Sequence, residues 1–149
     1  MKYVLDTNTF SALMKGDATV VGRLSRVGRP EVMVPRPVLA EIAYGIARLP
    51  RSRRRALLRE RLELLQGELA RAEWTDAVSA RFGEVKAALE RRGQRIEDFD
   101  AAIAAHALAE DATLVSGNAG HMRRVPGLAV EDWSRAGLKM PVDPTDEDR

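Results

Sequence analysis

The fold is decided at the start of the chain by the stretch KYVLDTN, which runs from Lys2 to Asn8. Lys2 to Leu5 is a short run rich in apolar residues, and it predicts a strand that stops at Asp6. Thr7 and Asn8 favour the start of a helix over a continued strand. This pattern places a carboxylate at the carboxyl end of a strand.

Outward from this stretch, short apolar runs alternate with amphipathic ones. A helix is expected to begin near Pro37, because proline suits the first turn of a helix. Further helices are predicted at Ala18–Val27, Ser52–Arg71, Asp76–Arg92 and Asp98–Ala109, and further strands at Val32–Val34, Thr113–Val115 and Ala129–Glu131. Strands that alternate with helices predict an α/β fold with a central parallel sheet between helical layers.

The two longest predicted helices follow each other directly in the sequence. Thr75 is a plausible N-cap of the second helix, and Gly93 is its expected stop. We interpret the pair, Ser52–Arg71 and Asp76–Arg92, as a helical arm or hairpin.

Length and composition fit a single domain. The chain has 149 residues and is 45% hydrophobic, which is enough for one well-filled core and too short for two ordinary domains. We expect one domain over residues 1–135. The end of the chain from Met140 is rich in Pro and Asp and lacks apolar periodicity, so a disordered tail is expected over residues 136–149.

Composition also limits location and metal chemistry. The sequence has neither an apolar run near the ~20 residues that a membrane span needs nor a signal-peptide pattern, so a cytoplasmic protein that does not enter a membrane is expected. The absence of cysteine excludes thiolate metal sites, disulfides and cysteine nucleophiles. Any metal must therefore be bound by oxygen atoms or by the two histidines, and oxygen ligands favour hard cations.

Charge is balanced overall but clustered locally. The formal net charge is +2, from 24 Lys and Arg against 22 Asp and Glu, and by itself it does not predict nucleic-acid binding. Seven arginines nevertheless fall within fourteen positions: Arg48, Arg51, Arg53, Arg54, Arg55, Arg59 and Arg61. Arg51, Arg53, Arg54 and Arg55 are candidate contacts to RNA. The equally weighted alternative is a solvated helix face, paired with Glu60, Glu63 and Glu68.

Three acids are placed to meet at the carboxyl edge of the sheet, where ligands of open α/β sheets bind. Asp6 ends the first strand, and Glu41 shares with Val38 and Gly45 the helix side that faces the sheet. Asp100 shares a face with the apolar residues of its helix. Asp98 points roughly 200° away from it at 3.6 residues per turn, and is the better helix cap.

A cluster of three carboxylates indicates a divalent cation. Like charges raise one another's pKa, and a cation removes this conflict. Mg²⁺ prefers one or two carboxylates, several waters and substrate phosphate oxygens. Such an ion activates water for attack on a phosphodiester. The mechanistic hypothesis is one ion bound by Asp6 and Asp100, with Glu41 close by, and RNA products that carry a 5′-phosphate and a 3′-hydroxyl.

Each of these residues also has a simpler interpretation. A single acid in a chain with 22 acids is far more often a surface charge or a cap than a metal ligand, and only the joint placement favours a site. His106, on an Ala-rich helix, is expected to be packed, and His121 is expected to be solvated in a loop. Neither histidine is assigned to catalysis.

Several segments in order resemble PIN-domain ribonucleases, in particular the VapC toxin branch. The segments are VLDTN at Val4–Asn8, PVLAEIAYG at Pro37–Gly45, FDAAIAAHAL at Phe99–Leu108, TLVSGN at Thr113–Asn118 and RVPGLAVEDW at Arg124–Trp133. The resemblance therefore covers nearly the whole chain, from Lys2 to about Trp133.

The resemblance implies a PIN fold, a three-layer α/β/α arrangement, and an endoribonuclease that depends on Mg²⁺ or Mn²⁺ and cuts tRNA or rRNA. It also implies a homodimer and inhibition by a small VapB-like antitoxin. Asp6, Glu41 and Asp100 match the acids of the first three motifs. Asn8, Ser116 and Asn118 are assigned to hydrogen bonds that orient ligands and water. Relatives often have an acid where this chain has His121, so a fourth ligand and a second metal ion stay open.

Two other classes compete with this interpretation. Phosphatases that resemble haloacid dehalogenases have a second Asp two residues after the first one, where this chain has Asn8. That difference makes a phospho-aspartate mechanism a poor match. The remaining alternative is a non-catalytic RNA- or protein-binding module of the same fold, against which the three acids argue.

Overall fold

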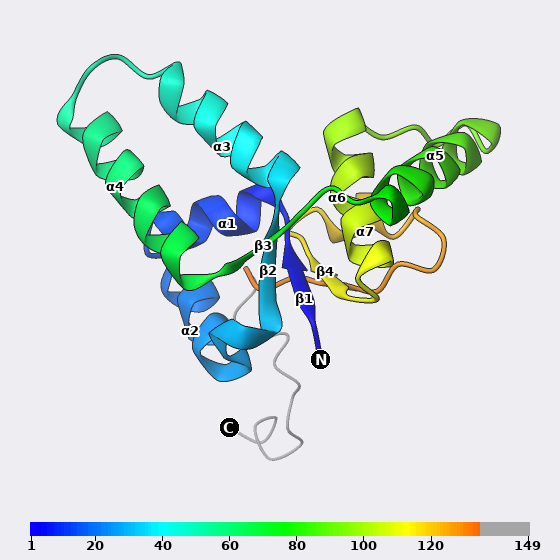
Figure 1. The fold of residues 1–149 in the computed structure, drawn as a ribbon, viewed down its shortest axis with the longest axis horizontal. Coiled ribbons are helices and arrows are strands. Elements are labelled where there is room, and N and C mark those ends of the chain that lie inside the picture. The colour runs from blue at the N-terminus through cyan, green and yellow to red at the C-terminus, as the bar shows by residue number, and fades with distance from the viewer. Residues whose placement is uncertain (135–149) are drawn as a thin grey trace.

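A parallel sheet forms the centre of the computed structural model, which describes residues 1–134. Within these residues the sheet has five strands in the order β3-β2-β1-β4-β5 (Figure 1). The strands are β1 (Tyr3–Leu5), β2 (Val32–Pro35), β3 (Ala70–Ala72), β4 (Thr113–Val115) and β5 (Val130–Glu131). The tail expected at 136–149 lies outside the described residues, and the domain boundary at 135 stays a prediction.

The first strand occupies the middle of the sheet. Tyr3 pairs with Val32 of β2, and Leu5 pairs with Val115 of β4, both in parallel register. All three residues of β1 are buried. This burial explains why the strand is a continuous apolar run, since central strands of parallel sheets are covered on both faces.

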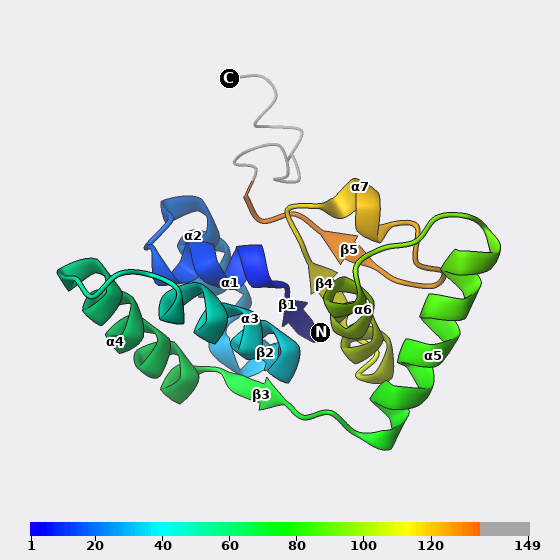
Figure 2. The same ribbon diagram turned by 90° about the horizontal axis from the view of Figure 1, so that it is seen from above.

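Two groups of helices flank the sheet, as Figures 1 and 2 show. The first group is α1 (Thr7–Met14), α2 (Ala18–Val27), α3 (Arg36–Ala47) and α4 (Arg53–Glu68), with a short 3₁₀ turn at Arg29–Glu31 before β2. The second group is α5 (Asp76–Arg91), α6 (Asp98–Ala109) and α7 (Ala119–Met122). The expected α/β fold with a central parallel sheet between helical layers is confirmed.

Local signals set several helix ends as expected. The Oγ1 atom of Thr75 accepts a hydrogen bond from the amide of Val78 at 3.3 Å, so Thr75 is the N-cap of α5. Gly93 follows α5 with φ at +67°, a left-handed conformation that suits glycine and stops a helix. Pro37 lies in the first turn of α3.

The prediction of one helix from Ser52 to Arg71 is wrong at its C-terminal end. The helix ends at Glu68, Leu69 is buried in extended conformation, and Ala70–Ala72 form strand β3. The residues of β3 have no strand-like pattern of their own. Backbone pairing with Met33–Pro35 of β2 makes them a strand, and this pairing depends on tertiary structure.

The prediction that the helices at Ser52–Arg71 and Asp76–Arg92 form one arm or hairpin is also wrong. Helix α5 packs against α6, whereas α4 packs against α1 and α3 (Figure 2). Strand β3 runs between α4 and α5, and carries the chain from one helical group to the other. The arm beside the sheet is therefore formed by α3 and α4.

The end of the described chain is anchored in the core by Trp133. Its side chain is fully buried, and its ring lies 5.5 Å from the ring of Tyr3 in β1. Its indole N–H donates a hydrogen bond to Oε1 of Glu131 at 3.0 Å. Over residues 1–134, no helix combines the length and apolar character needed to cross a membrane.

Candidate active site

Asp6 is fixed at the carboxyl end of β1, where the chain turns into α1. Its carboxylate accepts a hydrogen bond from the amide of Thr9 at 2.9 Å, which makes Asp6 the N-cap of α1. Its own amide donates to the carbonyl of Val115 in β4 at 3.0 Å. With 5% of its surface exposed, Asp6 is a buried acid at the sheet edge, as the sequence predicted.

Glu41 reaches the same edge from α3. It is partly buried, and its Oε1 atom accepts a hydrogen bond from the hydroxyl of Thr7, the first residue of α1. Thr7 is a site residue that was not predicted from the sequence. Its position directly after Asp6, within the first motif, was the available signal.

Asp100 lies in the first turn of α6 and is electrostatically coupled to the other two acids. Burial raises the pKa of its carboxyl, and the charges of Glu41 and Asp6 raise it further, while His121 opposes them. The structure therefore places Asp6 and Glu41 close enough for their charges to act on Asp100, although the three residues are far apart in the sequence.

Asp98 does not have the helix-capping role that the sequence predicts for it. The residue that caps α6 is Glu97, without a side-chain cap bond, and Asp98 is the first helical residue, so the expected cap is wrong. The carboxylate of Asp98 forms an ion pair with Nζ of Lys86 at 3.0 Å. This partner on α5 makes Asp98 a link between two helices.

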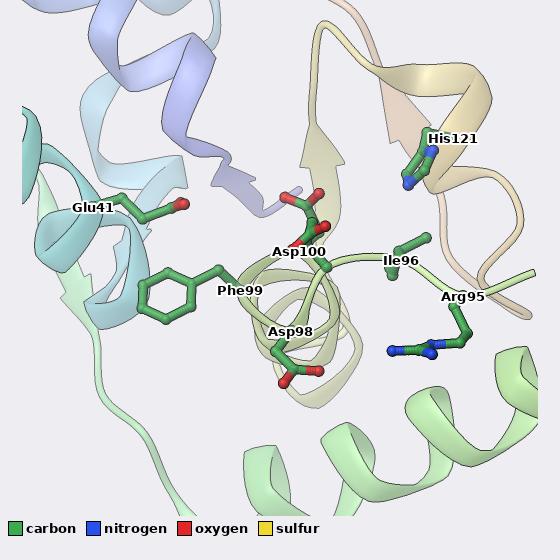
Figure 3. A pocket seen from close by; sticks show the side chains of 8 residues that line it. Glu41, Arg95, Ile96, Asp98, Phe99, Asp100 and His121 are labelled. Atoms are coloured by element: carbon green, nitrogen blue, oxygen red, sulfur yellow. The ribbon is translucent and has the colours of Figure 1, made fainter.

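Two of the three acids, Glu41 and Asp100, line a pocket of about 630 Å³, whereas Asp6 is buried and does not line it. Figure 3 shows Glu41 and His121 on opposite sides of Asp100, each directed into the pocket. The lining residues are Glu41, Arg95, Ile96, Glu97, Asp98, Phe99, Asp100 and His121.

His121 is a site residue that the sequence analysis placed wrongly. It belongs to α7, is partly buried and lines the pocket, instead of lying solvated in a loop. Its charge lowers the pKa of Asp100, so it acts as a partial counter-charge to the acids. The signal was its spacing of three residues after Asn118, where relatives often have an acid.

Of the three polar residues assigned to orienting hydrogen bonds, two lie together at the end of β4. Ser116 is buried, and its Oγ atom accepts a hydrogen bond from the amide of Asn118 at 3.0 Å. This bond shapes the turn that leads into α7 and thus to His121. The side chains of Asn118 and Asn8 are exposed, and Asn8 lies in the first turn of α1.

The donor set fits a hydrated divalent cation better than a closed protein cage. Among residues 1–134, no group of three or more His, Cys, Asp or Glu side chains is arranged to hold an ion. Glu41 and Asp100 nevertheless line one pocket, and burial together with the charges of Glu41 and Asp6 raises the pKa of Asp100. Mg²⁺ needs only one or two carboxylates, because it keeps several of its waters.

The arginine cluster is divided by the structure. Arg61 donates a hydrogen bond to the carbonyl of Met14 at 2.6 Å, so it joins α4 to α1. Arg48 lies over the ring of Tyr44 at 5.8 Å. Glu68, expected as a partner of the cluster, forms its ion pair with Arg29 at 2.8 Å. The remaining arginines lie at the N-terminal end of α4.

His106 is packed, as expected. It is fully buried in α6, and its ring meets that of Trp74 edge-on at 5.6 Å. Burial lowers the pKa of His106, which favours the neutral imidazole. It contributes to the core beside α5 and not to the carboxylate pocket.

The family model described as "PIN domain" matches residues 3–128. This match includes β1, α3, α6 and β4, the elements that carry the three acids and the turn before α7. The chain belongs to the PIN-domain family.

Two curated relatives place it among the VapC proteins. "Ribonuclease VapC2" of Rickettsia felis is 30% identical over 137 residues, which cover 91% of this chain and 100% of the relative. "tRNA(fMet)-specific endonuclease VapC" of Shigella flexneri is 28% identical, with 90% of this chain and 99% of the relative covered. The resemblance to the VapC branch is confirmed.

A solved structure agrees with the fold. The VapBC2 complex of Rickettsia felis, bound to a DNA fragment from its promoter, contains a chain similar to this one with a TM-score of 0.80. The two chains are 29% identical, and the match covers 89% of this chain and 99% of the other. A haloacid dehalogenase-like phosphatase is thereby excluded.

Proposed function

We propose that this chain is the endoribonuclease toxin of a toxin–antitoxin pair and that it hydrolyses RNA phosphodiester bonds in the pocket between α3 and α6. One observation carries the proposal. Glu41 and Asp100 come from separate helices and line one pocket, and Asp6 is buried at the end of β1, where its charge acts on Asp100. Family membership supports the same reaction.

The proposed cofactor is one Mg²⁺ or Mn²⁺ ion bound by Asp6 and Asp100, with Glu41 beside them. When bound, the ion supplies activation of water and stabilisation of charge on the phosphate. The chain contributes the positions of its acids: the Thr9 amide fixes Asp6, and the Thr7 hydroxyl orients Glu41. With His121 in the fourth position, a single ion is the simpler arrangement.

Asn8, Ser116 and Asn118 are proposed to orient ligands and water through hydrogen bonds. For Ser116 the support is indirect, because its hydroxyl accepts the amide of Asn118 and so sets the course of the chain toward His121. Asn8 and Asn118 have exposed side chains, which leaves them accessible to substrate and water.

The proposed substrate is tRNA or rRNA. The Shigella flexneri relative is named as a tRNA(fMet)-specific endonuclease. Arg51, Arg53, Arg54 and Arg55 are the proposed RNA contacts, since they lie together where α4 begins and three of them are exposed. Arginine binds phosphate groups through its planar fork of donors.

The proposed protein partners are a small VapB-like antitoxin and a second copy of the chain. The Rickettsia felis structure, a VapBC2 complex, supports the first partner. Exposed aromatic side chains support the second: Trp74 and Phe99 are each 45% exposed and Tyr44 is 66% exposed. The cytoplasmic location expected from the sequence belongs to the same proposal.

Metal-dependent cleavage by the purified protein tests the proposal. Wild type, Asp6→Asn and Asp100→Asn are incubated with RNA in Mg²⁺, in Mn²⁺ and in a chelator, with Glu60→Gln as an exposed acid control. We expect each Asn variant to lose about 100-fold or more in rate, because loss of a residue that only orients a ligand already costs about 10–100-fold. The control should match wild type.

Two results would contradict the proposal. RNA binding without cleavage in any version favours the non-catalytic module. A 2′,3′-cyclic phosphate at the cut would indicate attack by the ribose hydroxyl instead of water, whereas the proposal requires a 5′-phosphate and a 3′-hydroxyl.

A further inference from the structure

Three arginines line a second cavity, far along the arm from the carboxylate pocket. Arg51, Arg55 and Arg59, together with Ser52 and Ala56, enclose about 340 Å³ at the N-terminal end of α4. Arg55 and Arg59 are spaced by four and lie on one face of α4, and Arg51, which precedes the N-cap Ser52, lines the same cavity. We call this set the arginine row.

The arginine row is unfavourable for the helix that carries it. Helix α4 has no acid in its first turn, where Arg53, Arg54 and Arg55 lie instead. The N-terminus of a helix carries partial positive charge and favours acids, and like charges four residues apart repel each other. The sequence therefore concentrates cations where helix stability disfavours them, which indicates a purpose other than folding.

No charge within the described part of the chain neutralises the arginine row. Over residues 1–134, neither an ion pair nor a side-chain hydrogen bond satisfies Arg51, Arg55 or Arg59. The Nε atom of Arg55 is buried without a hydrogen-bond partner. A buried donor of this kind is costly unless a ligand satisfies it.

We propose that Arg51, Arg55 and Arg59 bind backbone phosphates of the RNA substrate outside the carboxylate pocket. This inference rests on the proposed function, in which Arg51 and Arg55 are already RNA contacts. It adds Arg59, assigns the three side chains to one cavity and names backbone phosphate as the group that they bind. Helix α3 leads from Glu41 outward to the connection before α4 (Figure 1). The remaining six residues of α3 after Glu41 rise by about 9 Å. The inference requires an RNA strand that spans this segment and the connection from Arg48 to Ser52.

The chemistry of the cavity favours a phosphate chain over a peptide. Arg55 and Arg59 are about 6 Å apart along α4, from four residues at about 1.5 Å each, and Arg51 lines the same cavity, so the set presents several guanidinium groups to the charges of one strand. Ala56 supplies the apolar part of the lining. A bound peptide normally needs larger apolar or aromatic anchors than one methyl group.

RNA binding separated from cleavage tests the arginine row. The full chain with Asp100→Asn, which prevents cleavage under the proposed function, is titrated with labelled bulk tRNA in a chelator over a range of salt. Arg51→Gln with Arg59→Gln removes two exposed charges of the row, and Arg91→Gln with Arg92→Gln removes two exposed charges of α5 as the matched control. A third protein also carries Arg55→Gln. Circular dichroism checks that each variant folds.

The row variant should bind tRNA about 20-fold more weakly near 0.1 M salt, and its salt slope should fall by about 1.4, as expected for two lost single-strand phosphate contacts. The control should change little. Equal effects in the two double variants would overturn the proposal. Unchanged tRNA affinity together with lost binding of a poly-glutamate peptide would also overturn it, in favour of an acidic protein contact. Cleavage of the same tRNA by the chain without Asp100→Asn, in Mg²⁺, shows separately whether the proposed function holds.

Discussion

The hydroxyl of Thr7 donates a hydrogen bond to the carboxylate of Glu41, and so joins the first residue of α1 to the middle of α3. Thr7 directly follows Asp6, and the same turn of chain therefore carries one proposed metal ligand and orients another acid. Neither helix fixes Glu41 alone, because a glutamate side chain has several rotatable bonds. This bond selects one of its positions.

Thr7→Val should weaken catalysis without unfolding the protein. Valine has nearly the same shape but cannot donate to Glu41, so we expect the rate of RNA cleavage at limiting Mg²⁺ to fall by about 10–100-fold. Thr7→Ser keeps the hydroxyl and should stay within a few-fold of wild type. Equal rates in all three proteins would show that the bond does not matter for the reaction.

Asp100→Asn should stabilise the metal-free protein near neutral pH. The folded state raises the pKa of Asp100 above its ordinary value of 3.8, because of burial first and then the charge of Glu41. The native carboxyl thus binds its proton more tightly than the unfolded one, and the free energy of unfolding falls as pH rises above 3.8. Asparagine removes this loss.

Urea unfolding of wild type and Asp100→Asn in a chelator measures the effect. Asp98→Asn is the matched control, since Asp98 has Lys86 as an ion-pair partner and should gain nothing. Addition of Mg²⁺ should stabilise wild type more than Asp100→Asn. A variant less stable than wild type in the chelator at neutral pH would contradict the assigned cause of the pKa shift.

Acid should destabilise the protein through His106. Burial lowers the pKa of His106 below 6.5, against the weaker opposing effects of Glu110 and Glu73. The unfolded chain therefore binds the proton more readily, and stability is lost as pH falls below 6.5. Replacement by leucine removes the titrating group from the interface with Trp74.

The measurement is the difference in unfolding free energy between about pH 7 and about pH 5, on either side of the ordinary pKa of histidine. It should be smaller in His106→Leu than in wild type, whereas His121→Gln should retain it. An identical pH dependence in His106→Leu and wild type would assign the acid sensitivity to other groups.

Trp133→Ala should destabilise the fold by about 3–5 kcal/mol, the usual cost of truncating a large buried aromatic side chain. The ring packs against Tyr3, and its indole donates to Glu131, which also pairs with Arg23 at 3.1 Å. Trp133→Phe keeps most of the packing and should cost less. Thermal or urea unfolding measures both variants, and a loss below 1 kcal/mol in Trp133→Ala would show that residues after β5 lie outside the cooperative core.

Local patterns were sufficient for most of the secondary structure. Helix α6 has the predicted bounds because alanine-rich sequence and an acidic first turn both favour a helix there. Strand β3 was missed, because Ala70–Ala72 become a strand only by pairing with β2. The arm was assigned to the wrong pair of helices for a related reason: the path of β3 separates α4 from α5.

In the candidate site, too, local patterns predicted some residues, and the positions of others depended on tertiary structure. Helical geometry distinguished Asp100 from Asp98, and the structure indeed couples Asp100 to Glu41 while Asp98 pairs with Lys86. His121 was misplaced, because its role depends on how the turn after Ser116 directs α7 toward α6. The spacing after Asn118 marked the position of His121, but no spacing along the chain specifies how α7 approaches α6.

The sequence by itself determined most strands and helices of the parallel core, β3 excepted, and which side of α3 and α6 carries an acid, because these properties depend on neighbours a few residues away. Only the tertiary structure decided that Thr7 orients Glu41, that His121 faces Asp100 and that three arginines share one cavity. Those relationships join residues that are distant in sequence or depend on the packing around them, and packing is set by the whole core at once.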